Sequence, residues 1–230
     1  MLSGRSQGAY GYAVVDLEAS GSSSRRHRVV ELAVVLLGRD LVPQGEFTTL
    51  VDPQGPVGPT HIHGIEAVHL GGAPRFAGIA ARLLTLLRGR VLVGHNVGCD
   101  RAFLAAEYAR VGLLLPAVPE LCTMRMAAAR SADRGAGDRG PRGLSLRACA
   151  TAAGITGWHP HTALGDARAT ADLFTRYAPH AAGLAERMAL AAALRWPEPS
   201  GLPAVADALW VRRGNESTRR TVPNVRNESA

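Results

Sequence analysis

The stretch YAVVDLEAS (residues 12–20) sets the organisation of the chain, because it joins an apolar strand to two acidic side chains. Residues 12–15 are aromatic or aliphatic and predict a buried strand that ends at Asp16. Side chains alternate between the two faces of a strand, so Asp16 and Glu18 project from the same face. Taken alone, this pair is more typical of a solvated acidic turn than of a binding site.

Two further strands are predicted close behind the first. Residues 29–37 (VVELAVVLL) and 47–51 are rich in aliphatic and β-branched side chains, and a polar, turn-forming stretch at 21–27 precedes them. Three strands at this spacing indicate an antiparallel meander. Helical periodicity then alternates with short apolar runs, which predicts an α/β fold with a mixed five-stranded sheet and helices on both faces. The remaining predicted elements are strands at 91–93 and 118–122 and helices at 76–87, 100–111, 123–130, 144–153 and 166–177.

The same pattern predicts the domain boundaries. One domain covers residues 10–177, with a flexible N-terminus at 1–9 and a C-terminal helix at 178–196. Residues 197–230 begin PEPSGLP and end in polar, basic sequence, which predicts a linker and a disordered tail. The Gly- and Arg-rich segment 131–143 is interpreted as a flexible surface loop, with a substrate-gripping loop as the alternative.

The composition narrows the class of protein. With 47% hydrophobic and 20% charged residues, the 230-residue chain is neither disordered throughout, nor collagen-like, nor a disulfide scaffold. The net charge is +7, and all 26 basic residues are arginine. The absence of lysine indicates a GC-rich coding bias, whereas the net charge points weakly to a nucleic-acid partner. Three widely spaced cysteines favour a cytoplasmic location, and no apolar run is long enough to span a membrane.

Two more groups of polar side chains follow strands or begin helices. HNVGCD ends at Asp100, at a helix start where an acid also has the ordinary role of stabilising the N-terminus. HTALGD places His161 in a loop and Asp166 at the next helix start, with His159 as the alternative histidine. The three groups together supply four carboxylates, and such hard oxygen ligands suit Mg²⁺ or Mn²⁺ better than zinc. Four carboxylates match a two-cation phosphodiesterase site, beside which a histidine can deprotonate water.

With these motifs in place, the chain from residue 12 to residue 177 resembles the DnaQ-like 3′→5′ exonucleases of the DEDDh class, the family of the epsilon proofreading subunit of bacterial DNA polymerase III. VVDLEAS resembles the first motif of that family, HNVGCD the second and HTALGD the third. THIHGIEAV (residues 60–68) is similar to the His-Gly-Ile segment between the first two motifs. The resemblance implies an RNase H-like fold and metal-dependent release of nucleoside 5′-monophosphates from DNA 3′ ends.

The resemblance also implies roles for individual side chains. His161 would be the general base, and two divalent cations, Mg²⁺ or Mn²⁺, would be the cofactors. The ligands of these cations would be four acids: Asp16, Glu18, Asp100 and Asp166. The pocket for the 3′-terminal nucleotide would be lined by Leu17, Ile62, His63 and Asn96. A plain packing role in the 60–68 turn is an equal alternative for His63.

Three positions depart from the pattern of the family. Ala19 replaces the usual threonine after the first motif, Cys99 stands where an aromatic residue commonly precedes the acid, and Cys122 stands where the family frequently has an acid. None is a predicted ligand, so these changes bear on pocket shape and substrate preference.

The sequence leaves more than one possibility for the substrate and for the function of the protein. The expected partners are single-stranded DNA 3′ ends and a DNA polymerase subunit. An RNA exonuclease of the same class is the first alternative. A non-catalytic module that only binds a replication partner is the second, although all five predicted catalytic positions are present.

Overall fold

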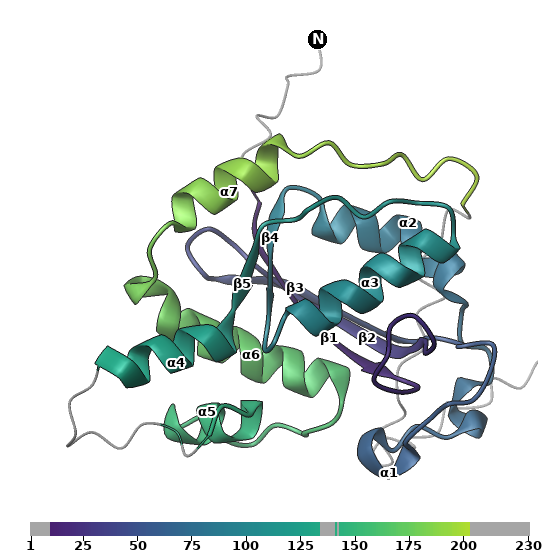
Figure 1. Cartoon of the computed structure of the whole chain (residues 1–230), viewed down its shortest axis with the longest axis horizontal. Helices are drawn as coiled ribbons and strands as arrows, with labels where there is room; N and C mark the ends of the chain where they lie inside the picture. The colour runs from purple at the N-terminus through teal and green to yellow at the C-terminus, as the bar shows by residue number, and fades with distance from the viewer. Residues whose placement is uncertain (1–9, 134–140, 142, 203–230) are drawn as a thin grey trace, which may run out of the picture.

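A computed structural model describes residues 10–133, 141 and 143–202, and its sheet is built on the strand that carries the first acidic pair. The five strands lie in the order β3-β2-β1-β4-β5. β1 pairs antiparallel with β2, which pairs antiparallel with β3, whereas β1–β4 and β4–β5 are parallel. The predicted meander and mixed sheet are therefore confirmed (Figure 1). The strands are β1 (Gly11–Ala19), β2 (Val29–Leu37), β3 (Pro43–Leu50), β4 (Arg90–Gly94) and β5 (Glu120–Cys122).

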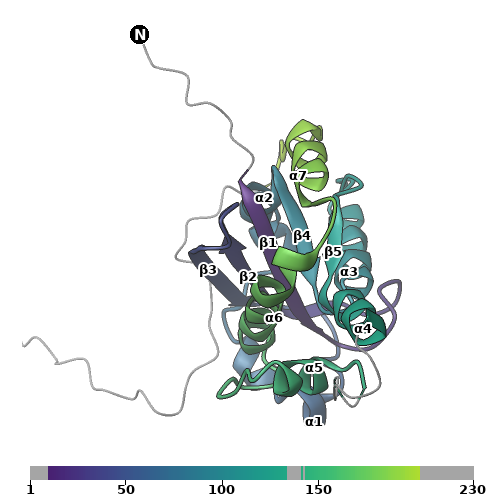
Figure 2. The same ribbon diagram turned by 90° about the vertical axis from the view of Figure 1, so that its left-hand side faces the viewer.

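Alternation along the strands divides the buried side chains between two cores. On β1, Ala13 and Val15 face one core, whereas Tyr12 and Val14 face the other. The first core is covered by α2 and α3, and the second by α6 and α7, so helices cover both faces of the sheet (Figures 1 and 2). The helices are α1 (Thr60–His63), η1 (Ala67–Leu70), α2 (Phe76–Leu87), α3 (Gly98–Arg110), α4 (Thr123–Asp133), α5 (Leu146–Ala152), α6 (Ala163–Tyr177), η2 (Ala178–His180) and α7 (Leu184–Ala193).

β1 is longer than predicted, and this difference matters most for the site. The prediction put Asp16 and Glu18 at the end of a strand whose apolar run covers residues 12–15, but pairing with β2 continues through Asp16, opposite Ala33, and Glu18, opposite Glu31. A β-bulge follows between Glu18 and Ala19. The acids therefore lie within the strand, because β2 offers a continuous edge that holds them in extended conformation.

Smaller differences concern the bounds of other elements. The helices predicted from Asp100 and Asp166 begin earlier, at Gly98 and Ala163, so each acid lies in a first turn. Two short helical segments, α1 and η1, were not predicted. Within 178–196, η2 and α7 replace a single helix. The predictions for 1–9, for 203–230 and for most of the 131–143 segment concern residues outside the described ranges. In the part of the chain that the structure describes, no helix has the length and apolarity needed to cross a membrane.

A buried ion pair joins the β1–β2 connection to α3. Arg28 Nε and Glu107 Oε1 are 2.8 Å apart, and a second guanidinium nitrogen donates to the other carboxylate oxygen at 2.9 Å. The Glu107 side chain is 1% exposed and also accepts the Val29 backbone N–H. Bidentate pairing of this kind fixes both distance and orientation. The pair therefore holds α3 against the start of β2.

We predict that Arg28→Met lowers the free energy of unfolding by about 3 kcal/mol, because it leaves a buried carboxylate without its main partner. Arg110 lies 3.3 Å from Glu107 and still pairs with it in the variant. The expected loss of stability is therefore near the lower end of the range for removing one partner of a buried ion pair. Urea denaturation measures the change. The matched control is Arg101→Met, which breaks an exposed pair with Glu120 and should cost at most about 1 kcal/mol. Equal losses in the two variants would contradict the role given to the buried pair.

Candidate active site

The site forms where β1 extends beyond β4. The last pair between these two strands is Val14 with Val93, so β1 from Asp16 onward has no β4 partner. The first turn of α3 lies there, and the backbone N–H of Leu17 donates to the Asp100 carboxylate. Gly94 permits this approach, because a Cβ at that position would lie only 3.2 Å from Asp100 Oδ2. Sheet topology thus places Asp100 beside the acidic end of β1.

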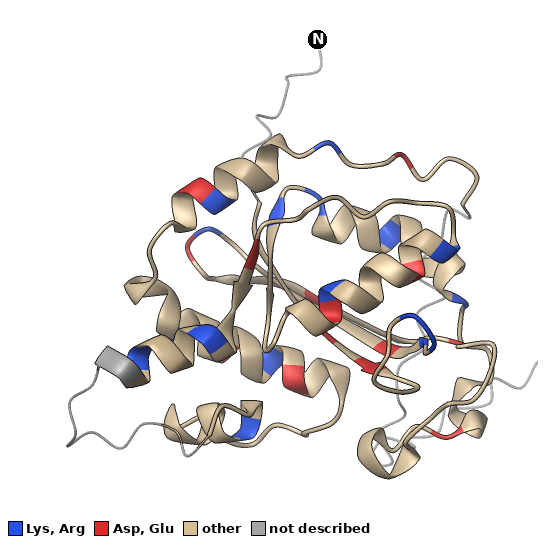
Figure 3. Cartoon of the chain, viewed as in Figure 1, with Lys and Arg blue, Asp and Glu red and all other residues tan. Residues whose placement is uncertain are grey.

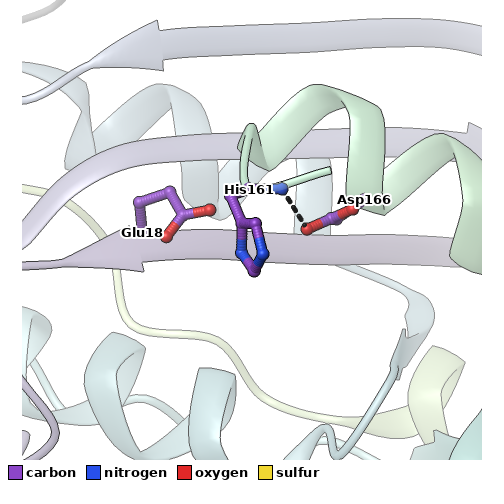
Figure 4. Close-up of side chains that lie close together, drawn as sticks. All are labelled: Glu18, His161 and Asp166. Atoms are coloured by element: carbon purple, nitrogen blue, oxygen red, sulfur yellow. Dashed lines mark hydrogen bonds between the residues drawn. The ribbon is translucent and has the colours of Figure 1, made fainter. Parts of the chain in front are cut away.

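The opposite side of the site comes from α6. Asp166 lies in the first turn of that helix, and His161 lies in the loop before it. Ligand atoms of Glu18, His161 and Asp166 all lie within 4.8 Å of one another. Figure 4 shows the Glu18 carboxylate and the His161 ring directed into the same space beside Asp166. Residues separated by more than 140 positions in the sequence therefore meet at one point.

The carboxylates affect one another electrostatically. Burial raises the pKa of Asp16 well above its usual range, and the charges of Asp100, Asp166, Glu18 and Glu31 raise it further. Burial likewise raises the pKa of Asp100 to about 8, against the opposing effect of hydrogen bonds from backbone N–H groups. Figure 3 shows acidic positions gathered where β1 and β2 meet the start of α3. Like charges held in low dielectric favour protonation or a bound cation.

The loop before α6 is held in an uncommon conformation. His161 has φ of 59°, in the left-handed region that non-glycine residues adopt at a cost of about 1–3 kcal/mol. Its backbone N–H donates to Asp166 Oδ2 at 3.0 Å, and Thr162 caps the helix by accepting the Gly165 N–H. These contacts fix the histidine relative to the acid that begins the helix (Figure 4).

The structure treats the four predicted substrate-binding residues differently. The side chain of Leu17 packs against the core on the α3 side, opposite Asp16 and Glu18. Ile62 is 47% exposed, and Asn96 is exposed with its amide donating to Cys99 Sγ at 3.1 Å. His63 is buried and its Nδ1 accepts the Ile65 N–H, which favours the packing alternative for this histidine. Contact of these four with a nucleotide stays a prediction.

Sequence reasoning missed Glu31. It is 3% exposed on β2, and its carboxylate accepts the backbone N–H of Ala163 at 2.8 Å. This contact attaches the first turn of α6 to the sheet. The sequence does contain a signal for it, since Glu31 is the single acid in the otherwise aliphatic run VVELAVVLL. An acid buried in such a strand needs a hydrogen-bonding partner.

His95 is a second residue whose role the sequence did not indicate. Its Nε2 lies 2.8 Å from the Leu144 carbonyl oxygen and its Nδ1 lies 2.9 Å from Thr123 Oγ1. A carbonyl only accepts, so Nε2 carries the proton and Nδ1 accepts from the hydroxyl. Burial lowers the pKa of His95, which favours this neutral form. The ring joins the loop after β4 to the start of α4 and to the segment before α5.

The donor set of the site fits hard divalent cations. The converging atoms are carboxylate oxygens with one imidazole, the ligand chemistry that Mg²⁺ and Mn²⁺ accept. Burial, with a smaller contribution from neighbouring acids, raises the pKa values of Asp16 and Asp100, and a bound cation would stabilise the charged forms that this environment disfavours. An arrangement of this kind can bind cations and place a proton acceptor beside them.

We predict that the cation-free protein becomes less stable as pH rises. A folded pKa of about 8 for Asp100 exceeds the unfolded value of about 3.9, so the folded state holds more protons between these values and stability falls across that interval. Asp100→Asn cannot ionise, so its advantage over the wild type should widen with pH. Urea denaturation in EDTA at several pH values measures this. Asp172→Asn, an exposed acid on α6, should parallel the wild type, and a parallel Asp100→Asn curve would refute the prediction.

Comparison with known proteins identifies the family of the chain. The family model RNase_T, described as "Exonuclease", matches residues 13–174. A Mycobacterium tuberculosis protein named as a bifunctional exonuclease/endonuclease is 34% identical over 170 residues, covering 70% of this chain and 25% of the relative. A DNA polymerase III subunit epsilon-like protein of Rhodobacter capsulatus is 33% identical over 174 residues, covering 73% of this chain and 24% of the relative. The chain thus spans about a quarter of the length of these curated relatives.

Solved structures show the same fold. E. coli exonuclease I in complex with a dT13 oligonucleotide superposes with a TM-score of 0.64 at 19% identity, covering 74% of this chain and 42% of the other. Exonuclease I from Methylocaldum szegediense gives a TM-score of 0.62 at 23% identity, covering 72% and 40%. The mixed sheet is therefore the RNase H-like fold of these enzymes. Since the family model matches residues 13–174, more than half of the chain, the chain belongs to the exonuclease family of DnaQ-like nucleases.

Proposed function

We propose that the protein is a divalent-cation-dependent 3′→5′ exonuclease that acts on DNA 3′ ends, preferably single-stranded or mismatched ones, in proofreading, replication or repair. The observation that carries the proposal is the convergence of four carboxylates and His161 from β1, α3, α6 and the loop before α6. Hydrolysis would add water to the terminal phosphorus and break its bond to the preceding 3′-oxygen. The product would be a nucleoside 5′-monophosphate.

The acids would divide between two cation positions. Asp16, Glu18 and Asp166 would hold the first, and Asp16 with Asp100 would hold the second. Asp16 belongs to both because its side chain interacts with each of the other acids. Two bound Mg²⁺ or Mn²⁺ ions would activate the attacking water and stabilise charge on the leaving oxygen.

His161 would accept the proton of the attacking water. Its side chain is exposed, so water and substrate can reach it, while its backbone is fixed through Asp166. General bases placed in this way contribute about 10²- to 10⁴-fold to rate. Its closeness to Glu18 and Asp166 puts the proton acceptor next to the proposed cation position.

DNA as the substrate is supported by the names of several relatives and of one solved neighbour. Ile62 and Asn96 offer an apolar and a polar surface for the terminal nucleotide, and every side-chain cation available for phosphate is an arginine. Several relatives are named as DNA polymerase III proteins, and one solved neighbour holds a dT13 oligonucleotide. A polymerase subunit is accordingly proposed as the partner.

We predict that Asp16→Ala abolishes release of nucleotides from a labelled single-stranded DNA, because both cation positions lose a ligand. His161→Ala should slow release by about 10²- to 10⁴-fold through loss of the base. Gel or HPLC analysis of products with Mn²⁺ measures both rates. Asp172→Asn, on the exposed face of α6, is the matched control and should keep the wild-type rate. Full activity of Asp16→Ala would place the reaction elsewhere.

We further predict faster hydrolysis of single-stranded DNA than of RNA of the same sequence. Rates of hydrolysis are compared on matched oligonucleotides with a paired, a mismatched or a single-stranded 3′ end. Faster hydrolysis of the mismatched than of the paired end would indicate proofreading, and equal rates would indicate general degradation. Asp16→Ala protein, prepared in the same way, controls for contaminating nucleases. Faster hydrolysis of RNA would support the RNA exonuclease alternative, and no hydrolysis of either by the wild type would overturn the enzymatic proposal.

A further inference from the structure

One side chain outside the family motifs contacts a predicted cation ligand. The Nε1–H of Trp158 donates to Asp166 Oδ1 at 2.9 Å. The other oxygen of the same carboxylate, Oδ2, accepts the backbone N–H of His161 at 3.0 Å. Both oxygens of Asp166 are therefore met by donors from the loop that precedes α6.

We propose that Trp158 is a positioning residue that sets the Asp166 carboxylate for cation binding, an inference that rests on the proposed function. A carboxylate with no such contact rotates about its terminal bond. Fixing it in one orientation then costs conformational entropy, which weakens cation binding. Hydrogen bonds to ligating carboxylates remove this freedom before the cation arrives.

The indole suits this task because it is a neutral donor. It has one N–H and accepts no hydrogen bond, so it can contact the carboxylate only as a donor to one oxygen. It also leaves the negative charge of Asp166 undiminished for a cation. An arginine or lysine at this place would neutralise the carboxylate and compete with the cation. Each carboxylate oxygen has more than one lone pair, so the oxygen that accepts the indole N–H still has capacity for a ligand bond.

Packing fixes the direction of the indole. Trp158 is half-buried against a small apolar cluster that contains Ile155 and Leu173. Trp158 also lines a cavity of about 430 Å³, together with Leu164 and Gly165. Because the ring packs against Ile155 and against Leu173 of α6, contacts within the fold direct its N–H to Asp166.

The decisive variant is Trp158→Phe, which keeps an aromatic ring and removes the donor. We expect the dissociation constant for Mn²⁺, measured by calorimetry or by the EPR signal of free Mn²⁺, to rise about 10- to 100-fold. The matched control is Trp196→Phe, since the buried Trp196 Nε1 meets no acceptor among the described residues. This control should keep the wild-type affinity. Equal affinity of Trp158→Phe and wild type would overturn the inference while leaving the proposed function standing.

A second measurement does not depend on the folding of Trp158→Phe. In wild-type protein labelled with ¹⁵N-tryptophan, the Trp158 indole N–H should change its chemical shift on addition of Mg²⁺ and on Asp166→Asn substitution. Asp172→Asn, on the same helix, should leave that signal unchanged. An indole signal indifferent to Asp166→Asn would overturn the inference. Failure of the wild type to bind Mn²⁺ at all would instead refute the proposed function, and the inference with it.

Discussion

Negative charge crowds the end of β1, and the surrounding elements are arranged around that constraint. Asp16 carries the raised pKa that results from its burial and its acidic neighbours. The donors that reach Asp100 and Asp166 in the contacts described above are backbone N–H groups and an indole, all of them neutral. Arginines instead neutralise acids elsewhere, as Arg28 does for Glu107. The carboxylate of Glu107 is thus neutralised by an arginine in a pair that stabilises the fold. The carboxylates of Asp100 and Asp166 receive only neutral donors in these contacts and keep the negative charge that can attract a cation.

Two further contacts hold the sides of this site in place. Glu107 fixes α3 to the first residue of β2, and Glu31, the third residue of the same strand, fixes α6 to it. β2 therefore anchors both helices that deliver acids to β1, although it supplies none of the predicted ligands itself. The contact with α6 accounts for the acid at position 31 in a strand that is otherwise apolar and buried along its whole length.

The sequence predicted the parts of the molecule that depend on local pattern. Alternation alone put Asp16 and Glu18 on one face, and the strand pattern of the first 51 residues gave the meander that the structure confirms. The order of the motifs identified the family. Glu31, His95 and Trp158 could not be placed in this way, because their partners lie 8 to 132 positions away and are brought together only by packing. The burial of His63 likewise depends on the turn that α1 forms, which is too short to leave a periodic signal.

The bulge after Glu18 separates two parts of the chain that should tolerate changes in length very differently. Side chains on a strand repeat every two residues, so a single insertion or deletion within residues 12–15 would turn both acids toward the α3 core and Leu17 toward the cation side. The same change in the turn at 21–27 leaves the alternation of β1 intact. Length variation among relatives should therefore gather beyond the bulge, and the segment before it should keep a constant number of residues.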